Sequence, residues 1–329
     1  MSNAHPTLNI DDLLNANRLL VMAKLRVAEG WNGRFQATGY PNLGSALYKG
    51  VRYTDGKPQT VEMLSVDSNQ AIVNWLESVC LAGEVYNTDC QGIPYVRVVE
   101  NGDRLVTTSV LEPHRLASDR IMDAQFNNAA YRMHLERVLS VNKKRPLRLQ
   151  AFLGPLFEID PGCVLHGVFL ERLDGRMRLP RLVSGFVEAG SPNQVNTGGL
   201  MRGYVTIEGE QSSIPYPRQD FSSTDIKASF IFHLSTLRDY QLAEGEADVQ
   251  RKRFLIAWML YKIDRFLHRP MRPRSACEFE LVGIEAKQDG TERSWPEAGA
   301  ILAAFQTVKG VVFPPLNGGR VTTVTHAGD

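Results

Sequence analysis

The sequence predicts a single α+β domain over residues 1–329. Segments with the composition of strands outnumber helical ones, and the two kinds do not alternate regularly as they do in a doubly wound parallel sheet. The chain has 329 residues, 43% of them hydrophobic, which suits a globular protein with a sizeable core. No internal repeat is visible, so a repeat architecture is not expected.

The first third of the chain supplies two helices and three strands. We expect a short helix over residues 11–17 and a strand over residues 19–27. Ser68 is a suitable N-cap for a second helix. The apolar stripe of that helix is formed by Ile72, Trp75, Leu76 and Val79. Residues 95–99 and 104–109 flank the turn Glu100-Asn101-Gly102-Asp103 and predict a hairpin.

The remaining elements are mostly strands. One long helix is expected at residues 247–268, because Phe254, Trp258 and Tyr261 share an apolar face and basic residues gather at the C-terminal end. That helix would be solvated on its charged face. Further strands are expected at residues 147–157, 164–173, 182–189, 226–234 and 276–286.

Several functional classes lack support. No run approaches the roughly 20 apolar residues of a membrane-spanning helix, and the first residues do not form a signal peptide, so a cytoplasmic protein is expected. The four cysteines are scattered without metal-ligand spacing, which predicts reduced thiols, no metal and no cofactor. Motifs for nucleotide hydrolysis, serine esterases and zinc proteases are absent.

The charge is nearly balanced overall but unevenly distributed. Residues 251–274 hold eight basic residues and one acid, and a second basic cluster runs from Arg132 to Arg148. Acids gather at residues 239–248 and 278–297. Opposite charges on one molecule would suit head-to-tail stacking of identical copies along a nucleic acid.

The segment from Gly33 to Gly44 has the composition of a phosphate-contacting loop. It reads G-R-F-Q-A-T-G-Y-P-N-L-G. The guanidinium of Arg34 can bind a phosphate in a bidentate manner, Gln36 adds an amide, and the glycines permit close backbone approach. An ordinary loop of Gly, Pro and Asn is the alternative.

Five segments in order resemble a known family. Besides residues 33–44 they are D-S-N-Q-A-I-V-N-W-L-E-S at 67–78, T-S-V-L-E-P-H-R-L-A-S-D-R at 108–120, R-L-P-R-L-V-S-G-F-V-E-A at 178–189 and D-F-S-S-T-D-I-K-A-S-F-I-F at 220–232. Together they resemble the RAMP-type backbone subunit of the type I-G (formerly I-U) CRISPR Cascade surveillance complex. The sequence departs from the family pattern at Ala37, Ala71, Val73 and Trp75, where the family has Pro, Ser, Ala and Arg.

This resemblance implies a modified RRM-like (ferredoxin-like) palm with finger insertions and a thumb hairpin. The thumb would lie at residues 190–223, a long polar segment for which a surface loop is the alternative. The implied function is non-catalytic: copies of the chain oligomerise along a CRISPR guide RNA (crRNA) and present it for pairing with target DNA. The implied partners are the crRNA, target DNA through the guide, further copies of the chain and other Cascade subunits, without a membrane.

The RNA-binding candidates combine these observations. Most are cations or amides that can grip phosphates without reading sequence. They are Arg34, Gln36, His114, Arg115, Lys143, Lys144, Arg145, Arg148, Arg202, Tyr204, Arg272 and Arg274. The N-terminus of the helix after Ser68 is a further possible phosphate contact, although a solvated polar stripe is the usual explanation.

Three alternatives remain open from sequence. An endoribonuclease that processes the guide precursor would use His114 as acid or base beside Arg115, whereas a lone histidine is commonly structural. Cleavage of target RNA by a loop acid such as Asp55 or Asp67 has no further sequence support. A purely structural protein that ignores RNA is the third alternative.

Overall fold

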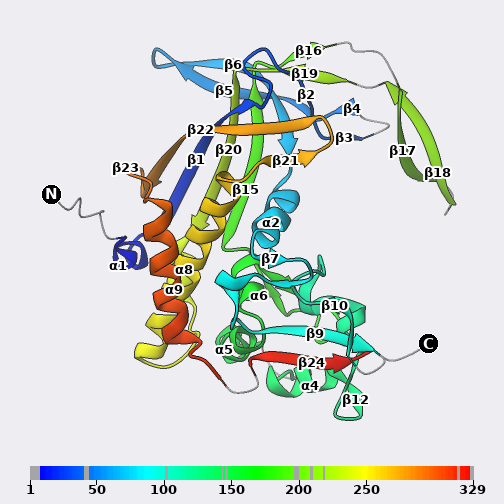
Figure 1. The fold of residues 1–329 in the computed structure, drawn as a ribbon, viewed down its shortest axis with the longest axis vertical. Helices are drawn as coiled ribbons and strands as arrows, with labels where there is room; N and C mark the ends of the chain where they lie inside the picture. Colours follow the sequence, from blue (N-terminus) through cyan, green and yellow to red (C-terminus); the bar gives the residue numbers. More distant parts are fainter. Residues whose placement is uncertain are drawn as a thin grey trace.

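An antiparallel eight-stranded sheet is the centre of the molecule (Figure 1). The computed structural model describes residues 8–40, 44–100, 103–142, 144, 147–195, 200–207, 210–217, 219–316 and 319–326. In spatial order the strands are β21 (Met271–Arg274), β22 (Cys277–Gln288), β1 (Arg18–Val27), β20 (Asp225–His233), β15 (Val183–Gly190), β6 (Lys57–Asp67) and β5 (Leu47–Thr54), with β23 (Thr291–Arg293) paired to β22. The expected α+β class is confirmed.

Four strands and two helices follow a βαββαβ order along the chain. These elements are β1, α2 (Asn69–Ser78), β15, β20, α8 (Glu246–Leu267) and β22, and their strands lie in the order β22-β1-β20-β15. This is the strand arrangement of a ferredoxin-like unit. α2 packs on β15 and on α8, and α9 (Ala298–Val312) packs along α8.

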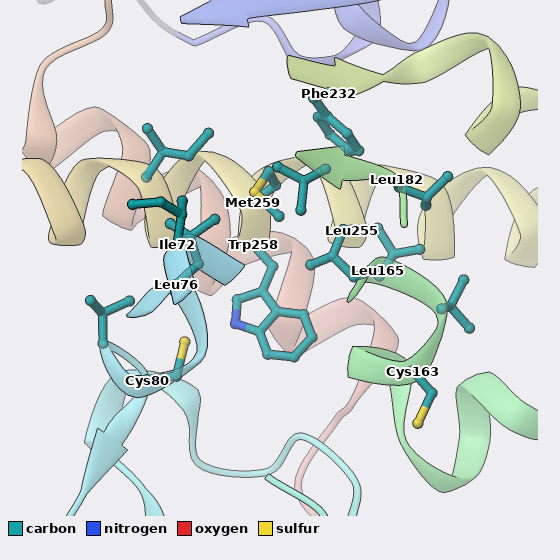
Figure 2. Close-up of a cluster of buried hydrophobic side chains, with 14 of the residues drawn as sticks. Ile72, Leu76, Cys80, Cys163, Leu165, Leu182, Phe232, Leu255, Trp258 and Met259 are labelled. Carbon is teal, nitrogen blue, oxygen red and sulfur yellow. The ribbon is translucent and has the colours of Figure 1, made fainter. Parts of the chain in front are cut away.

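The core lies between this sheet and the helices. Leu19, Val21, Ala23 and Leu25 alternate along β1 on its buried face, as the period of a strand requires. Figure 2 shows buried side chains that α2 and α8 contribute to this core, with Trp258 near the centre. The indole of Trp258 is fully buried, so this cluster supplies much of the hydrophobic stabilisation.

The helix α8 differs from the amphipathic helix expected at residues 247–268. Its position is confirmed, but nearly every side chain from Phe254 to Asp264 is buried. The physical reason is that α8 has neighbours on several sides: α9, α2, α1 (Ile10–Leu14) and α6 (Pro161–His166). A helix that is surrounded in this way is apolar on most of its circumference.

A smaller subdomain is inserted between α2 and β15. Its sheet has the order β10 (Arg104–Thr108), β9 (Tyr95–Glu100), β24 (Val321–Thr325), β11 (Gln125–Phe126) and β12 (Ala129–Ala130). β9 and β10 confirm the expected hairpin, and the C-terminal β24 joins β9 in parallel. In Figure 1 this sheet lies at the opposite end of the molecule from the β5–β6 hairpin.

Two of the strand predictions were wrong. Residues 147–157 fall largely in the helix α5 (Leu149–Ile159), and residues 164–173 contain the end of α6 and only the short strand β13 (Val168–Phe169). Phe152, Leu153, Leu156 and Phe157 are all buried, which is a helical spacing. The continuous apolar run resembled a buried strand, and Pro155 within it argued against a helix.

A long hairpin leaves the main sheet between β15 and β20. It consists of β17 (Leu200–Ile207) and β18 (Glu210–Pro217), and Figure 1 shows it projecting away from the sheet. The other elements are β2 (Phe35–Gln36), β3 (Gly39–Tyr40), β4 (Gly44–Ser45), β7 (Leu81–Ala82), β8 (Val85–Tyr86), η1 (Thr88–Cys90), η2 (Arg115–Ala117), α3 (Asp119–Met122), α4 (Tyr131–Val138), β14 (Arg178–Leu179), β16 (Asn193–Val195), β19 (Asp220–Ser222) and α7 (Leu234–Asp239).

The four cysteines are free and buried. Among the described residues no helix is both long and apolar enough to cross a membrane, and no cluster of His, Cys, Asp or Glu has the make-up of a metal site.

Candidate nucleic-acid interface

The main candidate site is a cleft of about 870 Å³ between the main sheet and the inserted subdomain. One wall is the N-terminal half of α2. The others are the segment around η2 and the ribbon of β13 and β14, with Ser184 at the start of β15. The cleft therefore collects residues that are more than a hundred positions apart in the sequence.

The N-cap predicted at Ser68 determines where α2, and with it one wall of the cleft, begins. The Ser68 hydroxyl accepts a hydrogen bond from the backbone N–H of Ala71, so the helix begins at Asn69 as predicted. Asn69, Gln70 and Asn74 line the cleft. On the opposite apolar stripe, Ile72 and Leu76 are fully buried in the core.

His114 and Arg115 both belong to this cleft but differ in exposure. His114 is exposed at its rim. The guanidinium of Arg115 is buried and pairs with Glu77, and its Nη1 lies 3.7 Å from Asp160 Oδ1. Arg115 also has a left-handed backbone (φ 51°), and a side chain at Gly162 would collide with its guanidinium. These contacts give Arg115 a positioning role in the cleft floor.

Three arginines on the other walls were not among the sequence candidates. Arg172 donates to Asp119 and Asp123 at 2.7–2.8 Å, and Arg181 donates to Gln70. Arg178 has no carboxylate partner among the described residues. The sequence did carry a signal for them, since Arg172, Arg176, Arg178 and Arg181 lie within ten residues.

The floor contains a buried lysine–histidine pair that the sequence did not reveal. Lys262 Nζ lies 2.7 Å from His166 Nε2 and 3.9 Å from the centre of the Trp258 ring. Burial lowers the pKa of Lys262 to about 8. Burial also lowers the pKa of His166 well below its ordinary value, with further lowering by Lys262, Arg115 and Arg181. No local motif marks the pair, because the two residues belong to different helices, α6 and α8, and only the tertiary fold brings them together.

A second group of candidates lies at β2, β19 and β21. Arg34 is 58% exposed, with Nε 3.7 Å from Asp220 Oδ2. Arg272 is 61% exposed and pairs with Glu278 at 3.0 Å. Arg274 is more constrained, since it donates to the Val66 carbonyl at 2.7 Å and to Asp67 at 3.1 Å. The carbonyl of Gln36 accepts a longer bond from Arg274, at 3.4 Å. None of these residues lines the cleft.

The other candidates are separate from both groups. Arg202 is exposed on β17, and Tyr204 belongs to the same strand. Lys144 is exposed in a turn, and Arg148 is exposed at the N-cap of α5. Lys143 and Arg145 lie outside the described residues.

Trp75 occupies the position where the resembled family has an arginine. Its ring is half-buried against the core, and the guanidinium of Arg269 lies 5.7 Å from the ring centre. A cation therefore does reach this part of α2, although it comes from the segment after α8 and stacks on the aromatic ring.

One comparison with known proteins identifies a family. Among curated proteins, none matches the sequence. One chain of a solved structure described as "CRISPR RNA-guided surveillance complex, pre-nicking" is similar over 90% of this chain and 89% of that chain, with 10% sequence identity and a TM-score of 0.32. The family model "CRISPR-associated protein GSU0053" matches residues 19–192, which are just over half of the 329 residues. The chain therefore belongs to the family of CRISPR-associated protein GSU0053.

Proposed function

We propose that this protein is an RNA-binding backbone subunit of a CRISPR RNA-guided surveillance complex. Copies would oligomerise along a crRNA and present it for pairing with target DNA, in contact with other subunits of the complex. The observation that carries the proposal is the position of the cleft: every residue that lines it lies within residues 19–192, the span matched by the CRISPR-associated family.

The arrangement of elements supports this proposal. The βαββαβ unit would serve as a RAMP palm, and the hairpin of β17 and β18 as the thumb that reaches over the guide. Exposed cations stand on three parts of the surface, represented by Arg34, Arg178 and Arg202. Such cations bind phosphates without reading bases, which suits a protein whose sequence specificity resides in a guide.

A non-catalytic role is part of the proposal, and one observation favours an alternative. The exposed imidazole of His114 lines the cleft together with Arg178, so an acid or base and a cation share one site. An endoribonuclease would shorten labelled guide precursor without partners, and this shortening would vanish in His114→Ala. We expect no shortening by either protein.

The purified protein tests the main proposal. We expect it to carry RNA, which raises the absorbance at 260 nm and gives protected fragments in regular steps on a denaturing gel. Protein that is free of RNA and ignores added single strands at low salt would refute the proposal.

Removal of single exposed cations tests the mode of binding. Each of Arg34→Ala and Arg202→Ala should weaken binding about equally for unrelated RNA sequences. Each should also reduce the slope of log affinity against log salt by about 0.7 if one phosphate contact is lost. A variant that binds one sequence normally and loses another would contradict non-specific gripping.

A further inference from the structure

The hydrogen-bond acceptors on the α2 wall of the cleft are already used. Asn69 Oδ1 accepts from the backbone N–H of Gly185 at 3.2 Å, and Gln70 Oε1 accepts from Arg181. Both partners can only donate, which fixes the orientation of these two amides. The amide nitrogen of Gln70 then donates to Asn74 Oδ1 at 3.0 Å. The groups left over for a ligand are the NH₂ groups of Asn69 and Asn74, and both are donors.

The charged groups of the cleft also leave a surplus of donors. Two of its three carboxylates are taken by arginines, Glu77 by Arg115 and Asp119 by Arg172. The third carboxylate is Glu171. The same cleft also holds two guanidiniums, Arg178 and Arg181, which have no carboxylate partner in the part of the chain that the structure describes, so positive charge exceeds negative charge.

The floor of the cleft adds a buried donor without an acceptor. The ammonium of Lys262 can only donate, so His166 Nε2 is the acceptor in their 2.7 Å contact and the neutral ring carries its hydrogen on Nδ1. His166 is 3% exposed, and its Nδ1 has no acceptor within the described residues. Nη1 of Arg115 makes no hydrogen bond either, although it lies 3.7 Å from the carboxylate of Asp160. Buried polar groups are normally satisfied, so the orphaned donor of His166 under the cleft indicates a missing acceptor.

We propose that this cleft binds a phosphate group of single-stranded RNA, with the amides of Asn69 and Asn74, the guanidiniums of Arg178 and Arg181, and a floor polarised by His166 and Arg115. A phosphodiester carries negative charge and oxygens that only accept, which complements a site whose remaining groups are almost all donors. The positive end of the α2 dipole meets the same cleft at Asn69 and favours an anion there. This inference rests on the proposed function and assigns the guide backbone to one particular place.

Two variants test the site, each with a matched control. Asn74→Asp keeps the shape and the oxygen that Gln70 contacts but replaces the free donor with an acceptor, and Arg178→Gln removes one unpaired cation. Gln59→Glu on β6 and Arg104→Gln on β10 change charge equally at exposed positions outside the cleft. Binding of a fluorescein-labelled oligouridine is followed by anisotropy at low salt. We expect both cleft variants to bind about 10- to 100-fold more weakly, and both controls to bind within about twofold of the unaltered protein.

The outcomes separate this inference from the proposed function. If the unaltered protein binds the oligouridine and the cleft variants bind equally well with native circular dichroism, the phosphate site is refuted while the proposed function stands. If the unaltered protein binds no RNA, the proposed function fails. Competition by inorganic phosphate and uridine monophosphate then identifies the source of the phosphate. Failure of both to displace the strand assigns a phosphodiester of the chain, whereas displacement at similar concentrations would overturn that assignment in favour of a free nucleotide.

Discussion

Replacement of the buried Lys262 by methionine should change how the stability of the protein depends on pH. Methionine has a similar unbranched length but does not titrate. In the folded protein burial lowers the pKa of Lys262 from its ordinary 10.5 to about 8. Between these two pH values the unfolded chain binds the proton and the folded chain does not, so the stability of the native protein rises with pH across this window. Below pH 8 the ammonium is buried in full and its cost is constant.

The expected size of this effect follows from the two pKa values. One pKa unit corresponds to about 1.4 kcal/mol, so the shift of Lys262 corresponds to about 3 kcal/mol of native-state destabilisation below pH 8. The methionine variant escapes this cost but leaves Nε2 of His166 without its donor, which costs about 1–3 kcal/mol at every pH. The two proteins can therefore have similar stabilities at pH 7, and the informative quantity is the difference between them as a function of pH.

Urea denaturation followed by far-ultraviolet circular dichroism measures this difference. Between pH 7 and pH 10.5 the free energy of unfolding of the unaltered protein should rise by about 3 kcal/mol relative to that of Lys262→Met. The other titrating groups are common to both proteins, and those whose pKa does not depend on Lys262 cancel in the comparison. A difference that stays constant from pH 7 to pH 10.5 would show that the Lys262 ammonium is not destabilised by burial, and the reasoning would be wrong.

The two remaining predictions concern packing. Trp258→Ala should lower the free energy of unfolding by about 3–5 kcal/mol, because removal of the fully buried indole leaves a large cavity. The control Trp31→Ala, at a 43% exposed site, should change the free energy of unfolding by less than about 1 kcal/mol. Equal urea midpoints for the two variants would contradict this prediction. Gly185→Ala should lower the free energy of unfolding by about 1–3 kcal/mol, since the added Cβ would lie 2.7 Å from Ile72 Cγ2 and 3.0 Å from the Ser229 carbonyl oxygen. In the control Gly283→Ala the added Cβ meets nothing within 4 Å. A thermal midpoint for Gly185→Ala as high as that of Gly283→Ala would refute the steric argument.

Elements with strong local signals were predictable from sequence. The alternation along residues 19–27 and the cap at Ser68 placed β1 and α2 closely, because strand periodicity and helix capping depend on neighbouring residues. The helix α5 was missed where Gly154 and Pro155 interrupt its pattern. The parallel pairing of β24 with β9 was not predictable, since it joins residues more than two hundred positions apart.

The site was only partly predictable for the same reason. The cluster of arginines at residues 172–181 is visible in the sequence, but its meeting with α2 depends on how the inserted subdomain folds back. Arg115 was expected to contact RNA beside His114. Its burial follows from Glu77 and Asp160, two carboxylates that only the tertiary fold brings to it.

The position of β1 in the main sheet determines how late in synthesis that sheet can be completed. β1 is made first, yet its two neighbours are β20 and β22, which end at His233 and Gln288. At about 5–20 residues per second the ribosome needs on the order of 10–50 s between the end of β1 and the end of β22. Until β20 has been made, the apolar row of β1 has no partner strand in the main sheet, and both of its native pairings are non-local and form slowly. The carboxylate of Asp289, which accepts hydrogen bonds from the backbone N–H groups of Asn17 and Arg18, fastens the start of β1 only after nearly nine-tenths of the chain has been made.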